Sequence, residues 1–354
     1  MAIRIVQIGI GPLGRKMTQS IVARPNMEVV AAVDMDPGLK GRDLGELCSL
    51  GNLGIQVSHS VKSTLGEVQA DVALLTTVSD LSRILPQIEE VIEQGLPVVT
   101  TCEELTYPWV TAPELAARLD ERAKKRGVAV LATGVNPGFM MDTLPVCLTA
   151  ISQNVEAIKV SRIQDAANRR VPFQRKIGAG LDPVEFEKRK NDGALRHVGL
   201  TESMHMIASR FGWKLDRAEE VITPVIANRT ISSNTMTIKP GVVAGVQQIG
   251  RAFIGMKEKI TLVFRASVGE SDPEDTIEIF GEPHIISTVQ GGVHGDVATC
   301  AVTLNAIPVL LNAEPGLKTM IDLPPVAFSL RYPRAQSRCR TPTDLSTRSH
   351  LSLG

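Results

Sequence analysis

The sequence predicts an α/β protein with an N-terminal, doubly wound parallel sheet and a second α+β domain built on a mostly antiparallel sheet. Two observations predict the first sheet. Short apolar runs alternate with amphipathic helical patterns as far as residue 134, and a glycine-rich turn follows the first apolar run. A third observation predicts the second sheet, because several long strand patterns in the second half follow one another without helices between them. The 354 residues are enough for two hydrophobic cores.

Composition excludes several classes of protein. Hydrophobic residues make up 43% of the chain and charged residues 21%, which is typical of globular proteins. The 38 basic and 38 acidic residues balance and form no polybasic block, which argues against nucleic acid or an anionic membrane as partner. No apolar run approaches the ~18 residues of a spanning helix, and the N-terminus has no signal-peptide pattern. The five cysteines lack C-x-x-C spacing, so no metal site is expected. Together these features predict a soluble cytoplasmic protein.

The first strand is expected at residues 3–8, and Gly9, Gly11 and Gly14 follow it in a G-x-G-x-x-G turn that leads into a helix. In a dinucleotide-binding turn the first glycine permits the tight turn, the second lets the pyrophosphate approach, and the third lets helix and strand pack closely. The helix N-terminus offers free N–H groups to phosphate. A second strand ends on Asp34, whose carboxylate can accept hydrogen bonds from ribose hydroxyls. Together these features predict a Rossmann-type domain.

The cofactor is expected to be NAD or NADP, and the preference stays open. Asp34 favours NAD, whereas Lys40 and Arg42 either meet the 2′-phosphate of NADP or are solvated loop charges. The residues expected to contact the cofactor are Gly9, Ile10, Gly11, Pro12, Leu13, Gly14, Asp34, Thr76, Thr77, Thr101 and Asn136.

The alternation continues with strands at residues 71–79, 97–101 and 128–134 and helices at residues 80–95 and 112–127. Ligands of such sheets lie beyond the carboxyl ends of the strands. That rule gathers three polar segments around one crevice, namely residues 76–78, 101–104 and 134–138.

The pattern changes in the second half of the chain. Helices are expected at about residues 141–153, 183–191 and 200–211, and strands at residues 155–166, 218–227, 242–255, 259–268 and 275–289. An apolar helix at residues 295–313 is expected to pack back against the first domain. We therefore expect a dinucleotide-binding domain (1–140), a substrate and dimerisation domain (141–294), a returning segment (295–330) and a flexible tail (334–354) rich in Ser, Thr and Arg.

Two adjacent glutamates stand where the strand at residues 97–101 ends. Thr101 and Glu104 have capping-box spacing, which predicts a structural role for Glu104 at a helix start. Glu103 has no such local role and lies at the mouth of the crevice. A carboxylate there can hold a cationic nitrogen and can move a proton to or from it. Glu103 is therefore the candidate catalytic acid, and Glu104 is the alternative.

Five segments carry a resemblance to a known family: the glycine-rich turn, "TTCEELTYPW" (100–109), "TGVNPGFMMD" (133–142), "SRIQDAANRR" (161–170) and "KIGAG" (176–180). Together they resemble the 2,4-diaminopentanoate dehydrogenase and native amine dehydrogenase family, a branch of the dihydrodipicolinate reductase-like fold. The similarity extends from Ile3 to about Pro325. The His-His-x-x-Lys run of true dihydrodipicolinate reductases is absent from the sequence.

The resemblance implies an enzyme that uses NAD(P)H to reduce an imine formed from a ketone or aldehyde and ammonia, or that deaminates an amine or diamino acid oxidatively. It implies that Glu103 is the essential acid, holding the iminium while the nicotinamide lies near Thr77, Thr101 and Asn136. The substrate pocket is expected to include Cys102, Val135, Met140, Arg162 and Gln164. The alternatives are a reductase of a cyclic imine and a non-catalytic NAD(P)-binding sensor.

Several other residues have open or structural interpretations. Arg162 either pairs with a substrate carboxylate or is structural, and strand alternation places Asp165 on the opposite face, where a structural role is expected. Lys176 is expected to be solvated, and His197 to be a structural histidine. The long strands of the second domain suggest a homodimer.

Overall fold

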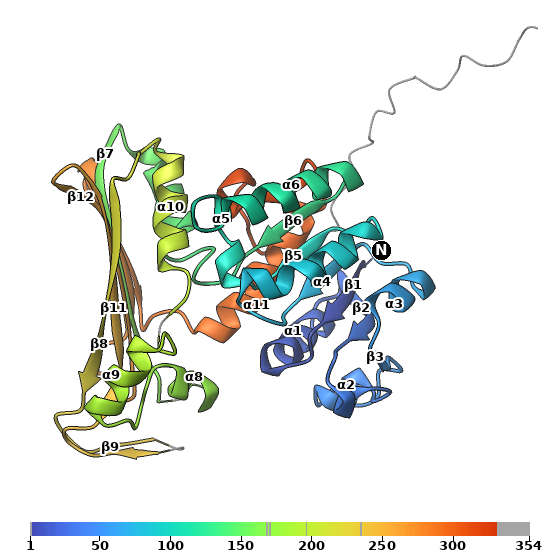
Figure 1. Ribbon diagram of the computed structural model, residues 1–354, viewed down its shortest axis with the longest axis horizontal. Coiled ribbons are helices and arrows are strands. Elements are labelled where there is room, and N and C mark those ends of the chain that lie inside the picture. The colour runs from blue at the N-terminus through green and yellow to red at the C-terminus, as the bar shows by residue number, and fades with distance from the viewer. Residues whose placement is uncertain (1, 168, 170, 196, 234–235, 331–354) are drawn as a thin grey trace, which may run out of the picture.

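The computed structural model describes residues 2–330 except 168, 170, 196, 234 and 235 (Figure 1). The tail expected at residues 334–354 therefore lies outside the described residues. A parallel sheet flanked by helices forms one part of the molecule, and a broad twisted sheet stands beside it (Figure 1).

The first sheet has the strand order β15-β6-β5-β4-β1-β2-β3, and every neighbouring pair is parallel. Its strands are β1 (Ile3–Ile8), β2 (Met27–Val33), β3 (Val57–Ser58), β4 (Val72–Leu75), β5 (Val98–Thr100), β6 (Ala129–Ala132) and β15 (Gly316–Lys318). Almost all of these residues are buried because helices cover both faces, which explains their continuous apolar runs. The doubly wound parallel sheet is confirmed. The short strands β3 and β15 were not expected from the sequence.

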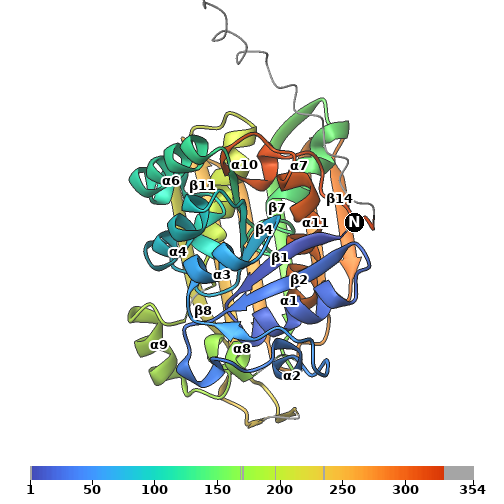
Figure 2. The ribbon, with the colours of Figure 1, turned by 90° about the vertical axis from the view of Figure 1, so that its right-hand side faces the viewer.

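Helices pack on both faces of this sheet (Figure 2). One face carries α1 (Pro12–Val22) and α11 (Gly295–Leu310), which share a hydrophobic core with β1. The other face carries α4 (Leu81–Glu93) and α6 (Pro113–Arg126). The remaining helices of the described chain are η1 (Pro37–Leu39), α2 (Leu44–Leu47), α3 (Val61–Glu67), η2 (Glu103–Leu105), α5 (Pro108–Thr111), α7 (Thr143–Leu148), η3 (Thr149–Ile151), α8 (Val171–Lys176), α9 (Pro183–Asn191), α10 (Leu200–Arg210) and η4 (Met320–Asp322). In the part of the chain that is described, none of the helices has the length and apolar character needed to cross a membrane.

The second sheet has the order β14-β13-β7-β12-β11-β8. Its strands are β7 (Asn154–Asp165), β8 (Arg217–Ile226), β11 (Val243–Ile254), β12 (Lys257–Ser267), β13 (Glu274–Glu282) and β14 (Ile285–Gln290). Only β7 and β12 pair in parallel, so the mostly antiparallel sheet is confirmed. A separate two-stranded sheet joins β9 (Ile231–Ser232) and β10 (Thr237–Ile238). In Figure 1, α10 lies between the large sheet and the first domain.

Three expected elements differ from the structure. Residues 275–289 form a hairpin of β13 and β14 rather than one strand, because the chain turns at Pro283, which has no N–H to donate to a ladder. The helix expected at residues 141–153 is divided into α7 and η3. The strand expected at residues 71–79 ends at Leu75, so Thr76 and Thr77 belong to the loop that follows it.

Candidate active site

A cleft of about 380 Å³ lies between the two domains. The first domain lines it with the glycine-rich turn and the loops that follow β4, β5 and β6. The second domain contributes β7, α8 and the loop before α10, and α11 contributes its first turn. The three polar segments expected at the carboxyl ends of the strands therefore meet at one cavity, as parallel topology requires.

The glycine-rich turn has the geometry that a dinucleotide needs. Gly9 has φ +90°, a left-handed conformation that favours glycine, and its carbonyl accepts a hydrogen bond of 2.8 Å from Thr76 Oγ1. A Cβ on Gly14 would lie 1.9 Å from Gly9 O, whereas a Cβ on Gly11 would meet nothing within 4 Å. Gly11 is also the N-cap of α1 and provides no side-chain cap. The open space and the uncapped helix end therefore fit a pyrophosphate group.

Asp34 holds this turn from the end of β2. Its Oδ2 accepts a hydrogen bond of 2.6 Å from Ile10 N, and its Oδ1 accepts one of 2.8 Å from Asp36 N. The Ile10 side chain is fully buried in the core, so Ile10 contributes through its backbone to Asp34. Gly11, Pro12 and Leu13 are the turn residues that line the cleft. The carboxylate of Asp34 is thus fixed beside the turn, where a ribose is expected.

The other residues expected to contact the cofactor differ in their hydrogen bonds to the rest of the protein. Thr77 and Thr101 line the cleft, and Thr77 Oγ1 donates to Gln87 Oε1 at 2.8 Å. Thr76 also lines it, although its hydroxyl is bonded to the glycine-rich turn. Asn136 is buried, and none of the described residues provides a partner for its Oδ1. That amide oxygen remains available to a ligand.

Asp142, the last residue of the "TGVNPGFMMD" segment, anchors the turn that carries Asn136. Its Oδ2 accepts hydrogen bonds from Gly138 N at 2.8 Å and from Ser203 Oγ at 2.7 Å, which ties the turn to α10. Burial raises the pKa of Asp142, against the lowering effect of the hydrogen bonds it accepts. This side chain is structural.

Glu103 begins η2 directly after β5 and lines the cleft. Its Oε2 is buried, and no described residue donates a hydrogen bond to it. Lys176 Nζ, from α8, lies 3.6 Å from that oxygen. Lys176 was expected to be solvated. It is half-exposed, but it lines the cleft because residues 171–176 form a helix that the sequence pattern did not predict.

Glu104 points elsewhere, and the predicted capping box with Thr101 is wrong. Glu104 Oε2 accepts a hydrogen bond of 2.9 Å from Leu81 N, in the first turn of α4. Cys102, not Thr101, precedes the short η2 helix, so the pair has no helix start to cap. The structural role of Glu104 holds with a different helix, whose N-terminal N–H groups favour a carboxylate. The two adjacent acids therefore serve different parts of the molecule.

Two expected pocket residues do not line the cleft. Cys102 is fully buried in the core, and its Sγ donates to Ser79 O at 3.1 Å. Burial raises the pKa of its thiol to about 12, so it carries no thiolate. Met140 is also buried and is not among the residues that line the cleft. Val135, Arg162 and Gln164 do line the cleft.

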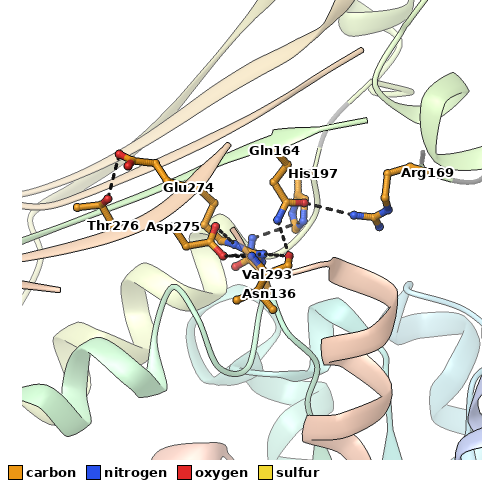
Figure 3. Close-up of polar contacts among 9 residues, drawn as sticks. Asn136, Gln164, Arg169, His197, Glu274, Asp275, Thr276 and Val293 are labelled. Atoms are coloured by element: carbon orange, nitrogen blue, oxygen red, sulfur yellow. Dashed lines mark hydrogen bonds and ion pairs between the residues drawn. The ribbon is translucent and has the colours of Figure 1, made fainter. Parts of the chain in front are cut away.

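Arg162 and Gln164 of β7 both line the cleft, and the burial pattern shows the expected alternation along the strand. Arg162 Nε donates to Asp275 Oδ1 at 2.9 Å, and its second nitrogen donates to Val293 O at 3.1 Å. Gln164 Nε2 also donates to Val293 O, at 2.9 Å (Figure 3). Asp275 pairs with the buried guanidinium, which favours the structural interpretation of Arg162 over pairing with a substrate carboxylate. Asp165 faces the other way and accepts from Gly269 N, as a structural acid.

A second ion-pair network borders the cleft and was not found from the sequence. Arg169 donates to Asp296 Oδ1 at 3.1 Å and to Gln164 Oε1 at 3.3 Å (Figure 3), and it stacks on Phe173 at 4.1 Å. Lys16 of α1 donates to Asp296 Oδ2 at 3.1 Å. The network links α1, α11 and the second domain. The sequence signal for it is the single acid at the start of an apolar helix.

His197 also lines the cleft, although a structural histidine was expected. Gln248 fixes its backbone, because Gln248 Oε1 accepts from His197 N at 2.7 Å and Gln248 Nε2 donates to His197 O at 3.0 Å. Its ring packs on Phe264 with 4.2 Å between centroids. Burial, followed by the charges of Lys176 and Arg162, lowers the pKa of His197 to about 3. The ring is therefore neutral at physiological pH.

Comparison with known proteins gives matches over both domains. Residues 139–335, more than half of the chain, match the family model of the 2,4-diaminopentanoate dehydrogenase C-terminal domain, and residues 3–104 match that of the dihydrodipicolinate reductase N-terminus. The 2,4-diaminopentanoate dehydrogenase of Acetoanaerobium sticklandii is 31% identical over 333 residues, covering 91% of this chain and 93% of the relative. The amine dehydrogenase of Streptomyces virginiae is 22% identical over 351 residues, covering 89% and 94%.

A solved structure, the amine dehydrogenase from Mycobacterium smegmatis, has the same fold. Its TM-score to this chain is 0.81 at 23% identity, with 94% of this chain and 99% of that chain covered. The glycine-rich turn, the cleft at the carboxyl ends of the strands and the matches over both domains agree with one another. The chain belongs to the 2,4-diaminopentanoate dehydrogenase family of NAD(P)-dependent oxidoreductases.

Proposed function

We propose that this amine dehydrogenase-type enzyme reductively aminates a ketone or aldehyde with ammonia in the interdomain cleft, and that Glu103 holds the iminium. The reverse reaction is oxidative deamination of an amine or diamino acid. One observation carries the proposal: a buried carboxylate oxygen of Glu103, to which no described residue donates a hydrogen bond, lines the same cavity as the glycine-rich turn. A carboxylate placed there is complementary to a cationic C=N group.

The residues present fit a dinucleotide. Gly11, Pro12 and Leu13 would lie along its pyrophosphate, Asp34 along a ribose, and Thr77, Thr101 and Asn136 near the nicotinamide. When bound, NAD(P)H supplies the hydride. The protein supplies position and electrostatic field, and it excludes water from part of the cleft.

Glu103 is proposed to move one proton and then to stabilise one charge. It takes a proton from ammonium, and the resulting ammonia forms a C–N bond with the carbonyl carbon. The C=O π electrons move to oxygen, which takes a proton from the new ammonium group, and a carbinolamine results. Glu103 returns the proton to the departing hydroxyl, the C–O bond breaks, and the nitrogen lone pair forms the C=N bond. Water leaves, and the regenerated carboxylate pairs with the iminium, whose positive charge makes its carbon electrophilic.

The substrate is proposed from two sources. The name of the Acetoanaerobium relative points to a diamino acid, and that of the Streptomyces relative points to an amine. Phe173, Ile177 and Val246 give the second-domain wall of the cleft an apolar lining, and Lys176 adds a positive charge. We therefore propose a small amine or diamino acid, together with the corresponding ketone.

The function is tested by following NAD(P)H oxidation with a panel of ketones in the presence and in the absence of ammonium. Turnover that requires ammonium is expected. Turnover without ammonium would indicate reduction of the C=O group to an alcohol, and turnover with a cyclic imine alone would favour the imine-reductase alternative. Cofactor binding with no turnover on any carbonyl or amine would favour the sensor alternative.

Asp34 gives a prediction about cofactor preference. Because its carboxylate is fixed at the end of β2 by Ile10 N and Asp36 N, it is expected to repel a 2′-phosphate, so we expect NAD to be preferred. Asp34→Ser should raise the ratio of kcat/KM with NADPH to that with NADH by about tenfold, equivalent to ~1.4 kcal/mol. Lys40 lies in the exposed loop that follows, and Lys40→Met serves as the control. A fall in kcat/KM with NADPH in this variant would show that the Lys40 ammonium contacts the 2′-phosphate. An unchanged ratio in Asp34→Ser would contradict the assignment.

A homodimer is proposed through the outer face of the second sheet. An uncharged row crosses that face and is formed by the paired residues Thr288, Thr276, Ser161, Val263, Ile249 and Val221. The next row contains both acids and bases, namely Glu219, Arg251, Lys159 and Glu278. A two-fold axis can place the uncharged row of one copy on that of another and the acids of one copy beside the bases of the other. We therefore propose a second copy of the chain as the partner of this face. We also propose a cytoplasmic location, as expected from the sequence.

The dimer is tested by introducing charge into the uncharged row. Ile249→Glu should convert the dimer to a monomer, as measured by light scattering after size-exclusion chromatography. Met256 lies in the exposed β11–β12 turn, so Met256→Glu should leave the mass of the dimer in solution unchanged. A monomeric wild-type protein would rule the interface out.

A further inference from the structure

The imidazole of His197 has no part in the mechanism proposed above, although it lines the same cleft as Glu103. Glu103 belongs to the first domain, and His197 precedes α10 in the second. His197 Nδ1 is buried, and it has no hydrogen-bond partner among the described residues. Buried polar atoms are nearly always paired in native proteins, so such an atom beside a cavity points to a ligand.

The structure fixes the position of this ring. Gln248 holds both backbone groups of His197, and its own Nε2 also donates to Glu220 Oε2 at 2.5 Å. Phe264 packs against the ring. A side chain held from its backbone and its face keeps its orientation when a substrate binds.

Asn136 contacts the other nitrogen of the ring. Asn136 Nδ2 lies 3.4 Å from His197 Nε2, and the two side chains face each other in Figure 3. With the amide as donor, Nε2 accepts, so Nδ1 carries the proton and becomes a donor. Asn136 Oδ1 remains open for the carboxamide of the cofactor.

A neutral donor suits this cleft better than a charged one. Burial and the nearby charges of Lys176, Arg162 and Arg169 keep the imidazole uncharged, so it does not repel a developing iminium. A neutral imidazole can still polarise a carbonyl by donating a hydrogen bond to its oxygen.

We propose that His197 Nδ1–H binds the oxygen of the substrate during imine formation. The inference rests on the proposed function. Glu103 pairs with the nitrogen of the carbinolamine and also reaches its hydroxyl group, whereas His197 contacts only the oxygen. Glu103 supplies the proton as the C–O bond breaks and water forms, while His197 donates a hydrogen bond throughout and loses no proton. Holding nitrogen and oxygen on different residues also fixes the face of the carbon that receives the hydride.

The test separates imine formation from imine reduction. His197→Phe keeps a ring to pack on Phe264 and removes both nitrogens. It should lower kcat/KM for reductive amination of a ketone by about 100-fold, the effect of losing one donor to a developing charge. Reduction of the preformed cyclic imine 2-methyl-1-pyrroline should change by less than about threefold, because this substrate has no oxygen for His197 to bind. His197→Gln restores an N–H donor and should recover part of the ketone activity, whereas Glu103→Gln should impair both reactions.

The deuterium isotope effect with 4-deuterated NAD(P)H gives a second measurement on the ketone reaction. In His197→Phe it should shrink toward one, because imine formation and not hydride transfer becomes limiting. Equal losses with ketone and imine, or an undiminished isotope effect, would assign His197 a purely structural role and overturn the inference. If His197→Phe does not fold, His197→Leu is measured in the same way. A wild-type enzyme inactive with every ketone would instead contradict the proposed function itself.

Discussion

Replacing Glu103 by glutamine is expected to lower kcat/KM for reductive amination by about 100-fold, or ~3 kcal/mol of transition-state stabilisation. The amide keeps the shape of the side chain but removes the charge proposed to face the iminium and the capacity to carry a proton. No described residue donates a hydrogen bond to Glu103 Oε2, so the fold gains little from this carboxylate. We therefore expect the melting temperature to remain nearly unchanged. Steady-state kinetics and a thermal unfolding scan measure the two quantities on one preparation.

The neighbouring acid provides the matched control. Glu104→Ala leaves Leu81 N at the start of α4 without its carboxylate partner, which should cost ~1 kcal/mol in the free energy of unfolding. Its kcat/KM should stay within about threefold of the wild-type value, because the carboxylate that faces the cleft is retained. Normal turnover in Glu103→Gln, or a larger catalytic loss in Glu104→Ala, would transfer the catalytic role away from Glu103.

Lys176 is the ion-pair partner of Glu103 in the cleft without substrate. At 3.6 Å the two side chains form a loose, partly exposed ion pair, and such pairs contribute little to stability. A substrate cation can therefore replace Lys176 beside Glu103 at small cost. The lysine, which is on the exposed rim, can move toward solvent. This arrangement gives the carboxylate a loose partner without committing it to a structural one.

Local patterns predicted the fold and one side of the cleft. Gly9, Gly11 and Gly14 lie within a single strand–turn–helix unit, so their spacing carries most of their geometry. The convergence of Thr101, Glu103 and Asn136 follows from the rule that parallel strands end on one edge. These predictions need no knowledge of distant contacts, and the structure places all of these residues at or beside one cavity.

The other side of the cleft could not be predicted in this way. His197 and Asn136 are 61 residues apart in the sequence, and Arg162 and Asp275 are 113 apart. Contacts at such separations cannot be predicted from the spacing of neighbouring residues. Cys102 and Met140 were misplaced for a different reason. Beyond a strand end the period of two no longer applies, and the direction of each side chain depends on the loop. For the same reason Glu104 serves α4 and not its own turn.

A matched pair of glycine substitutions should separate the architecture of the cofactor turn from its contact with cofactor. In Gly14→Ala the new methyl group would lie 1.9 Å from the backbone oxygen of Gly9 and 2.8 Å from Thr76 Oγ1. Helix α1 and β1 must therefore move apart, which should cost about 3 kcal/mol in the free energy of unfolding. Because the same movement distorts the turn, binding of NAD(P)H should be lost as well. Thermal unfolding and cofactor fluorescence titration measure the two effects.

In Gly11→Ala the methyl group meets no protein atom within 4 Å, and the backbone at φ −69° is accessible to alanine. The melting temperature should therefore stay close to that of the wild type. The methyl group would instead occupy the space through which the pyrophosphate approaches, so the Kd for NAD(P)H should rise about 10- to 100-fold, equivalent to ~1–3 kcal/mol of steric cost. Loss of binding without loss of stability is what distinguishes a contact surface from a packing requirement. Unchanged cofactor affinity in Gly11→Ala would mean that the dinucleotide does not lie across this turn, and the position of the hydride donor relative to Glu103 would then have no support.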